Sequence, residues 1–148
     1  MAKTAIIYWS GTGNTREMAK AIQRGTRKAG AEAQIFEVEQ FGADELQNYD
    51  GVFFGCPAMG DEVLEEGSFE PFFASVESKL QGMPVALFGS YGWGGGAWMD
   101  TWQERTKGDG AKMFRAGLTV ENGPTDKDLA ACEELGTSFV KSLIGAEA

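Results

Sequence analysis

The chain has 148 residues, of which 43% are hydrophobic, and its formal net charge at pH 7 is -9. This length and composition predict a single globular domain over residues 1–148. No stretch reaches the roughly 20 consecutive apolar residues of a membrane span, and the first residues lack the apolar core of a secretory signal. We therefore expect a cytoplasmic protein that does not enter a membrane.

The residue types that are missing or rare exclude several kinds of site. The sequence contains no histidine, which rules out Ser-His-Asp triads and histidine-ligated metals. Cys56 and Cys132 lie far apart and form no Cys-x-x-Cys pair. We expect two buried thiols in a reducing compartment, with neither a redox dithiol nor a metal site.

The negative charge is concentrated in the middle of the chain. From residue 29 to residue 78 there are twelve Asp and Glu but no Lys or Arg, whereas the remainder holds 13 basic and 10 acidic residues. Such a surface repels nucleic acid and anionic lipid. The expected partners are basic surfaces of other proteins, which would dock weakly and transiently.

Five apolar runs, read as strands of a buried parallel sheet, follow one another along the chain. They are residues 5–9, 33–38, 51–56, 84–90 and 113–120. Between and after them, apolar residues have helical spacing at residues 16–29, 69–80, 97–106 and 126–143, with a weaker pattern at 44–48. This alternation predicts an α/β fold in which helices cover both faces of an open five-stranded parallel sheet.

Three of the segments that follow strands have unusual compositions. They are residues 10–15, 57–67 and 91–99, which come after the first, third and fourth predicted strands. In open parallel sheets, ligands bind beyond the carboxyl ends of the strands, where the strand order reverses. We therefore expect these three loops to form a binding site together.

The first loop has the chemistry of a phosphate-binding turn. Its hydroxyl and amide side chains can donate hydrogen bonds, its glycines let backbone N–H groups turn inward, and the following helix presents its positive end. The donors are Ser10, Thr12, Asn14 and Thr15, and the glycines are Gly11 and Gly13. The loop lacks the lysine of a nucleotide-hydrolysing loop and the third glycine of a dinucleotide fingerprint. We expect a phosphate dianion here without a compensating cation.

The other two loops favour a planar ring. The second is acidic and carries Met59 at its tip, and the third places large aromatic side chains among four glycines. An aromatic residue at the ligand end of a sheet is suited to stacking on a ring. By contrast, Trp98 and Trp102 lie four residues apart on one helical face and are expected in the core, with Trp9 in or near it.

The three loops together resemble those of the flavodoxins, small electron carriers that bind flavin mononucleotide (FMN). Ser-Gly-Thr-Gly-Asn-Thr at 10–15, Ala-Met-Gly-Asp-Glu at 58–62 and Gly-Ser-Tyr-Gly-Trp-Gly at 89–94 are similar to the flavin loops of the short-chain, clostridial type. The resemblance implies a flavodoxin-like three-layer sandwich with strand order 2-1-3-4-5, and a monomer. The cofactor-binding residues it implies are Ser10, Gly11, Thr12, Gly13, Asn14, Thr15, Ala58, Met59, Gly60, Asp61, Glu62, Ser90, Tyr91, Gly92, Trp93 and Gly94, with no catalytic residue and no metal ligand.

The resemblance also implies individual roles. The first loop would bind the FMN phosphate, Met59 would lie on the inner ring face and Trp93 would cover the outer face. Glu62 would accept a hydrogen bond from the ring imide, and Gly60 would let the preceding peptide flip toward the central ring nitrogen. Many flavodoxins have a tryptophan where Met59 lies, so the inner-face contact is open between Met59 and Ala58.

The function implied is that of a low-potential one-electron carrier that shuttles between semiquinone and hydroquinone. Acidic residues near the ring, at positions 61, 62, 65 and 66, would disfavour the anionic reduced flavin. The alternative is an FMN-dependent NAD(P)H:quinone reductase on the same fold, although no second nucleotide site is evident. A receiver domain and a cysteine phosphatase share the architecture, but the residues after the first and third predicted strands do not fit either.

Overall fold

A parallel β-sheet forms the centre of the protein. The computed structural model describes residues 2–11, 13–59, 63–92 and 95–147. The sheet order is β2-β1-β3-β4-β5, with β6 also paired to β4, and all of these pairings are parallel. The strands are β1 (Lys3–Tyr8), β2 (Glu32–Glu37), β3 (Gly51–Gly55), β4 (Pro84–Tyr91), β5 (Lys112–Met113) and β6 (Leu118–Glu121). The predicted fold class and strand order are confirmed.

The fifth predicted strand differs from expectation because it is divided into two short strands. Both β5 and β6 pair with β4, at its beginning and at its end. Between them, the Gly117 N–H donates to the side chain of Gln103 rather than to the sheet. A Cβ at Gly117 would also overlap the sulfur of Met99. The Phe114 N–H still donates to the Val85 carbonyl of β4 at 3.0 Å, so the chain leaves the sheet only after Phe114 and packs against α3 at Gly117.

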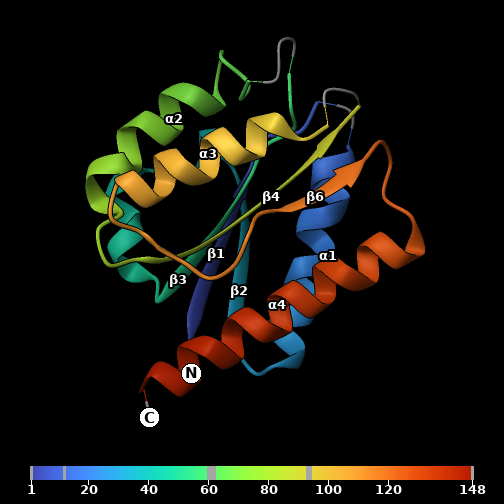
Figure 1. Cartoon of the computed structure of the whole chain (residues 1–148). Coiled ribbons are helices and arrows are strands. Elements are labelled where there is room, and N and C mark those ends of the chain that lie inside the picture. Colours follow the sequence, from blue (N-terminus) through green and yellow to red (C-terminus); the bar gives the residue numbers. More distant parts are fainter. Residues whose placement is uncertain (1, 12, 60–62, 93–94, 148) are drawn as a thin grey trace.

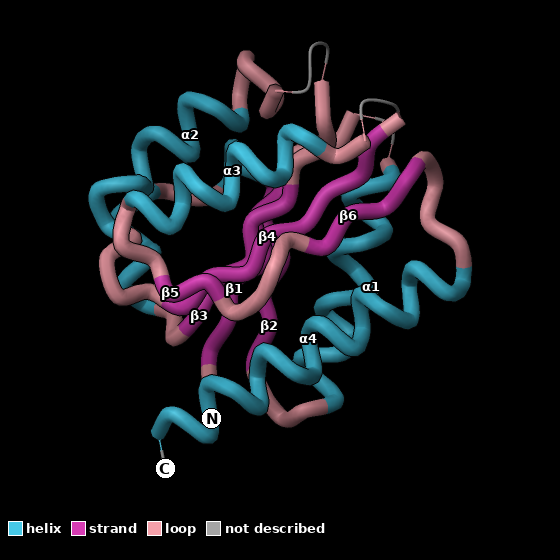
Figure 2. The backbone as a smooth tube through the Cα atoms, viewed as in Figure 1, coloured by secondary structure: helices cyan, strands magenta, loops and turns pink. Residues whose placement is uncertain are grey.

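Helices cover both faces of the sheet, as Figures 1 and 2 show. On one face lie α2 and α3, and on the other lie α1 and α4. The helices are α1 (Asn14–Lys28), α2 (Phe69–Val76), α3 (Ala97–Gly108) and α4 (Asp126–Glu147), with 3₁₀ turns η1 (Val38–Gln40), η2 (Ala43–Asn48) and η3 (Glu77–Lys79). The weak pattern at 44–48 thus corresponds to η2, and the predicted helix 69–80 ends as η3. None of the helices in the described ranges is long and apolar enough to cross a membrane.

The two faces of the sheet bury different side chains. The face under α2 and α3 is rich in aromatic rings, including the predicted core residues Trp98 and Trp102, whereas the face under α1 and α4 is mainly aliphatic. Cys56 and Cys132 are buried, unpaired thiols, as predicted. Burial raises the pKa of the Cys56 thiol and raises that of Cys132 to about 12, so both thiols stay protonated near neutral pH.

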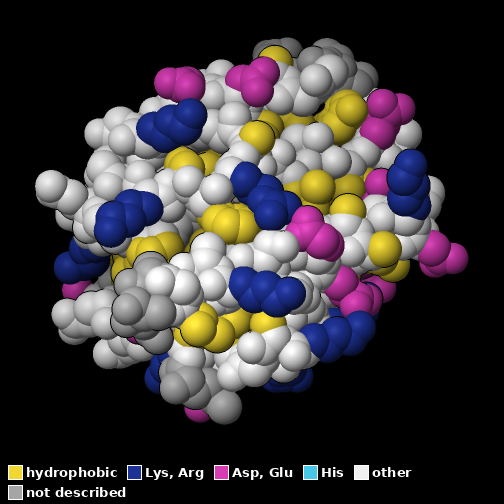
Figure 3. Space-filling view, turned by 60° about the horizontal axis from the view of Figure 1, so that its bottom comes forward, with side chains coloured by type: hydrophobic (Ala, Val, Ile, Leu, Met, Phe, Trp, Pro, Cys, Tyr) yellow, Lys and Arg dark blue, Asp and Glu magenta, His cyan; other side chains and the backbone are white. Residues whose placement is uncertain are grey.

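The topology brings the three unusual loops together. Because β1 lies between β2 and β3, the chain winds in opposite directions on its two sides, and the strand order reverses there. The segments after β1, β3 and β4 lie at the upper end of the sheet in Figure 1, and both termini lie at the lower end. Turned so that this lower end comes forward, the surface shows Lys and Arg interspersed with Asp and Glu (Figure 3).

Candidate functional site

A cavity of about 300 Å³, here called the loop pocket, opens at the carboxyl ends of the strands. It takes residues from the segments after β1, β3, β4 and β6, which are far apart in the sequence. They are Trp9, Gly11, Asn14, Pro57, Ala58, Met59, Ser90, Tyr91, Gly92 and Asn122. The predicted meeting of three loops is therefore present, and a fourth segment joins them.

Backbone hydrogen bonds hold these segments in place. The Ala58 N–H donates to the Ser90 carbonyl at 2.9 Å, and the Asn122 N–H donates to the Tyr91 carbonyl at 2.7 Å. The first bond continues the β3–β4 pairing to the third residue after β3, and the second continues the β4–β6 pairing to the first residue after β6. The walls of the loop pocket are therefore extensions of the sheet, and their positions follow from its register.

The first loop is arranged to receive an anion. Gly13 adopts a φ of 100°, which a residue with a side chain rarely accepts, and its N–H donates to the Ser10 hydroxyl at 3.0 Å. Helix α1 begins at Asn14, so the N–H groups of its first turn have no acceptor one turn earlier in the helix. Donors at a helix N-terminus favour phosphate.

A buried hydroxyl pair links the first loop to the third. Thr15 is 1% exposed and Ser90 is 5% exposed. Their oxygens lie 3.4 Å apart, although the residues are 75 positions apart in the sequence. Each hydroxyl can donate to a ligand as well as to its neighbour. This pair therefore connects the phosphate-type loop to the loop pocket.

An arginine lies beside the first loop, where we expected no compensating cation. Arg16, in the first turn of α1, lines a hollow of about 190 Å³ together with Ser10, Gly11, Gly13 and Glu37. A hydrogen bond from Arg16 to Tyr8 raises the pKa of the guanidinium, which remains charged at any physiological pH. The expectation of a loop without a compensating cation stays a prediction, because the structure shows Arg16 beside the turn and in contact with Tyr8.

The second loop is closed by a small antiparallel bridge. The Met59 N–H donates to the Val63 carbonyl at 2.8 Å, and the Val63 N–H donates to the Met59 carbonyl at 3.1 Å. Met59 is 37% exposed at the rim of the loop pocket, and this exposed position suits a contact with a bound ring. The predicted residues Gly60, Asp61 and Glu62 lie outside the described residues.

Glu65 has a structural role that sequence reasoning missed. Its carboxylate accepts hydrogen bonds from the N–H groups of Gly67, Ser68 and Phe69 at 2.7–2.8 Å, and so caps α2. Burial alone would raise the pKa of Glu65, but these three donors hold it below its usual range. The negative charge of Glu65 therefore stabilises the N-terminus of α2. Glu66, by contrast, is exposed to solvent.

The sixteen predicted site residues fall into three groups. Seven line the loop pocket: Gly11, Asn14, Ala58, Met59, Ser90, Tyr91 and Gly92. Ser10, Gly13 and Thr15 form the adjoining turn, while Thr12, Gly60, Asp61, Glu62, Trp93 and Gly94 lie outside the described residues. Sequence reasoning missed Asn122, included Pro57 only as part of the second loop, and placed Trp9 in or near the core, against which it packs. Asn122 has a φ of 59° in an Asn-Gly pair after β6, which is a recognisable turn signal.

The family model for flavodoxin matches residues 6–136. The chain belongs to the flavodoxin family. It is 47% identical to a flavodoxin of Clostridium beijerinckii over 88% of this chain and 94% of the relative, and 44% identical to one of Megasphaera elsdenii over 93% and 98%. The solution structure of two-electron reduced Megasphaera elsdenii flavodoxin superposes with a TM-score of 0.85 at 43% identity, covering 93% of this chain and 98% of that one.

Membership of the flavodoxins establishes the general function. The protein is an FMN-binding electron-transfer protein rather than an enzyme, and the quinone reductase alternative is not favoured. The described residues fit this cofactor. The turn that contains Ser10, Gly13 and Thr15 offers hydroxyl and N–H donors of the type that a phosphate requires, and the adjoining loop pocket offers rings and small residues.

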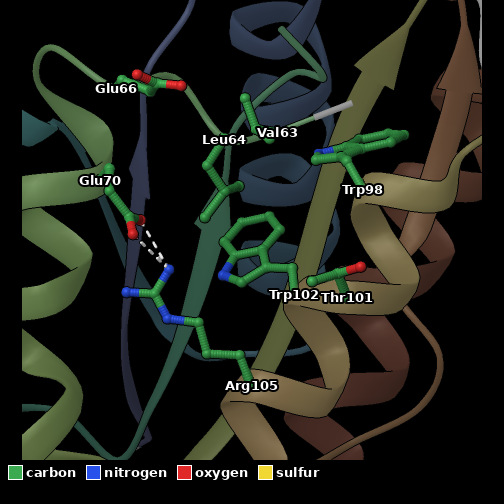
Figure 4. Close-up of a pocket in the computed structure, with 8 residues that line it drawn as sticks. All are labelled: Val63, Leu64, Glu66, Glu70, Trp98, Thr101, Trp102 and Arg105. Atoms are coloured by element: carbon green, nitrogen blue, oxygen red, sulfur yellow. Dashed lines mark hydrogen bonds and ion pairs between the residues drawn. The ribbon is translucent and has the colours of Figure 1, made fainter. Parts of the chain in front are cut away.

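A larger cavity of about 440 Å³ lies nearby and is here called the helix cavity (Figure 4). Its lining residues are Val63, Leu64, Glu66, Glu70, Trp98, Thr101, Trp102 and Arg105. Its arginine is already bound by Glu70 and Glu77, and Glu66 adds a further carboxylate at the rim, so it does not suit a phosphate. The smaller loop pocket is therefore the better site for FMN, despite the difference in volume.

Proposed function

We propose that residues 1–148 act as one FMN-binding domain in which the loop pocket holds the cofactor. Ser10, Asn14, Thr15 and the backbone of the turn would bind the phosphate, while Thr12 would add a further hydroxyl. The observation that carries this proposal is the buried contact between Thr15 and Ser90. It supports a single ligand that reaches from the first loop to the third.

The remaining predicted contacts concern the ring. Met59 or Ala58 would face its inner side and Trp93 its outer side. Glu62 would hold the ring imide, and Gly60 would allow the peptide after Met59 to turn toward the ring. Asp61, Tyr91, Gly92 and Gly94 would complete the two loops.

The bound FMN supplies electron transfer in one-electron steps. The contribution of this chain is to orient the ring, to limit water on its faces and to set the surrounding charge. Glu66 and the acidic residues of the second loop would disfavour added negative charge on the ring, which supports a low potential. Arg16 opposes this effect at the phosphate end, so the potential depends on the balance between the two ends of the site.

The charge distribution also supports the choice of partner. We propose that basic surfaces of redox proteins dock near the second loop, where acidic residues predominate, and that this docking is transient and weakens with salt. The protein would act in the cytoplasm, where its two buried thiols remain reduced.

An anaerobic titration of the FMN-loaded protein with dithionite, followed by visible absorbance, tests this function. We expect two separate one-electron steps, with the second at low potential. A single two-electron step would contradict the proposed carrier and favour hydride chemistry. Titration of the apoprotein with FMN and with riboflavin tests the site, because equal affinities for the two would contradict a phosphate-binding turn.

A further inference from the structure

The helix cavity lies outside the proposed FMN site but next to it. Trp98 lines the helix cavity and Tyr91 lines the loop pocket, and the centroids of their rings are 5.7 Å apart. This ring pair therefore lies where the two cavities approach each other. A volume of about 440 Å³ is within the range of small-molecule sites, which typically combine an apolar floor with a few polar groups.

The floor of the helix cavity is apolar and aromatic. Leu64, Trp98 and Trp102 are all buried, at 9%, 2% and 1% exposure. Trp102 is fixed from behind by Phe69 and Phe73, whose ring centroids lie 5.4 and 5.8 Å from its own in edge-to-face contacts. A rigid aromatic floor of this kind suits a flat ligand rather than a flexible chain.

One buried donor on this floor lacks an acceptor. Within the described part of the chain, no hydrogen-bond partner lies in reach of the Trp102 indole N–H. Leaving such a donor unpaired destabilises the fold, and most buried polar groups in folded proteins are paired. In Figure 4 the nitrogen-bearing edge of Trp102 is turned toward Arg105 and Glu70. A ligand acceptor that entered here would relieve this cost.

The charged groups at the rim select against anions. The Arg105 guanidinium donates to Glu70 at 2.7 and 2.8 Å and to Glu77 at 2.7 and 2.9 Å, so two carboxylates already neutralise it. These contacts raise the pKa of Arg105 above its usual value. Glu66 adds a third carboxylate at the rim. The net charge around the helix cavity is therefore negative. The rim groups that can still form hydrogen bonds with a ligand are carboxylate oxygens, which accept them.

We propose that the helix cavity binds a neutral, planar heteroaromatic lactam. The lactam carbonyl accepts the Trp102 N–H, the lactam N–H donates to the Glu70 carboxylate, and the ring lies on Leu64 and the tryptophans. The Trp102 N–H is covered in the structure, so binding requires the rim pair of Glu70 and Arg105 to move. That pair is partly exposed, at 41% and 29%, and Arg105 keeps its contact with Glu77, which limits the cost.

The test uses FMN-loaded protein with isotope-labelled tryptophan and the bicyclic lactam carbostyril as the probe. We expect a saturable shift of the Trp102 indole N–H signal, which is assigned by its loss in Trp102→Phe. The flavin absorbance should show that FMN stays bound. The anionic analogue quinaldate, of similar size, should give no such shift.

Three variants sharpen the test. Trp102→Phe keeps a six-membered aromatic ring but removes the indole donor, and should weaken carbostyril binding about tenfold. Thr101→Trp, at an exposed lining position, should fill the cavity and abolish binding. Glu104→Gln, on the same helix but outside the lining, is the matched control and should bind as the wild type does.

Several results would overturn the proposal. They are the absence of a Trp102 shift, an undiminished response in Thr101→Trp, full affinity in Trp102→Phe, and competition between carbostyril and FMN. The last result would place the lactam in the loop pocket instead. If Trp102→Phe fails to fold, Thr101→Trp and quinaldate still decide the question. Because the readout is a tryptophan signal, it is independent of the redox function proposed above.

Discussion

The loop pocket and the helix cavity meet at the ring pair of Tyr91 and Trp98 but are built from different parts of the chain. The loop pocket is formed where strands end, so backbone groups, glycines and hydroxyls dominate it. The helix cavity is formed mainly by α2, α3 and the segment before α2, so long side chains dominate it, and its charges are largely paired with one another.

The difference indicates what each cavity can bind. Backbone N–H groups at a helix start have fixed directions and carry no counterion, so they suit an external anion. Side chains from helices bring both signs of charge and neutralise each other before a ligand arrives. A phosphate is therefore expected to bind at the loop pocket, and a neutral molecule in the helix cavity. The predictions below separate the two.

The largest effect is expected where one residue supports both cavities. Gly89 lies in β4, and a Cβ there would overlap the Cys56 carbonyl and approach the Trp98 ring at 3.1 Å. Trp98 donates to that same carbonyl at 3.2 Å. Gly89→Ala should lower the free energy of unfolding by about 3 kcal/mol, and should weaken FMN binding as well. Urea unfolding and FMN titration measure the two effects.

The control for this change is Gly108→Ala, in the last turn of α3. A Cβ there meets no atom within 4 Å, so we expect an unchanged or slightly higher stability. If the Gly89→Ala protein were as stable as this control, that result would contradict the close packing of β4 against β3 and Trp98.

The next effect should be confined to the loop pocket. Thr15→Val removes the buried hydroxyl beside Ser90 while keeping a similar shape. A hydrogen bond to a charged group contributes about 2 kcal/mol, so FMN affinity should fall about thirtyfold. Riboflavin affinity should hardly change, because riboflavin lacks the phosphate.

Fluorescence titration of the apoprotein measures both affinities. Thr119→Val, at an exposed position of β6, is the matched control and should bind FMN normally. An equal loss for FMN and riboflavin in Thr15→Val would show that the hydroxyl acts on the ring or on the fold rather than on the phosphate.

A smaller effect, on the free energy of unfolding, is expected for Asp109, which follows the last residue of α3. Burial and the neighbouring Glu77 carboxylate raise the pKa of Asp109 to about 6, and Asp109 also lies at the negative C-terminal end of α3. The folded state thus binds this proton more tightly than the unfolded chain, whose pKa is about 3.9. The resulting stabilisation is complete below about pH 4 and is lost as the pH rises through 6.

Asp109→Asn should therefore be more stable than the wild type at pH 7.5, by about 1 kcal/mol after solvent screening. The difference should shrink at pH 4.5. Urea unfolding at the two pH values measures it. Asp126→Asn, at the start of α4, is the contrasting control. A carboxylate at a helix N-terminus is favourable, so its loss should destabilise the protein at pH 7.5. If the difference in the free energy of unfolding between Asp109→Asn and the wild type were the same at both pH values, the raised pKa of Asp109 would be refuted.

The smallest effect concerns the cation beside the first loop. Arg16 is exposed and faces Glu37, so its attraction for the phosphate is screened. Arg16→Gln should weaken FMN binding about threefold and reduce its salt dependence, with riboflavin unaffected. Lys20→Gln, one turn further along α1, is the control and should change neither. A salt dependence equal to that of the wild type would exclude Arg16 from phosphate binding.

The alternation of strands and helices and the identity of the loops at the site could be predicted from the amino-acid sequence alone. These follow from local patterns: continuous apolar runs, helical spacing, and glycines with hydroxyls at a strand-to-helix turn. The burial of Trp98 and Trp102 followed from the same spacing. Such signals lie within a few residues of one another, and local backbone preferences and the separation of apolar from polar side chains are enough to read them.

Contacts between groups that are distant in the sequence became visible only in the folded protein. The contact of Thr15 with Ser90, the entry of Asn122 into the loop pocket and the pairing of Arg105 with Glu70 and Glu77 all depend on how elements pack across the sheet. The break in the fifth strand likewise results from Gln103 and Met99 of α3. These contacts join residues many positions apart, so their geometry depends on strand register and helix packing and not on any local pattern.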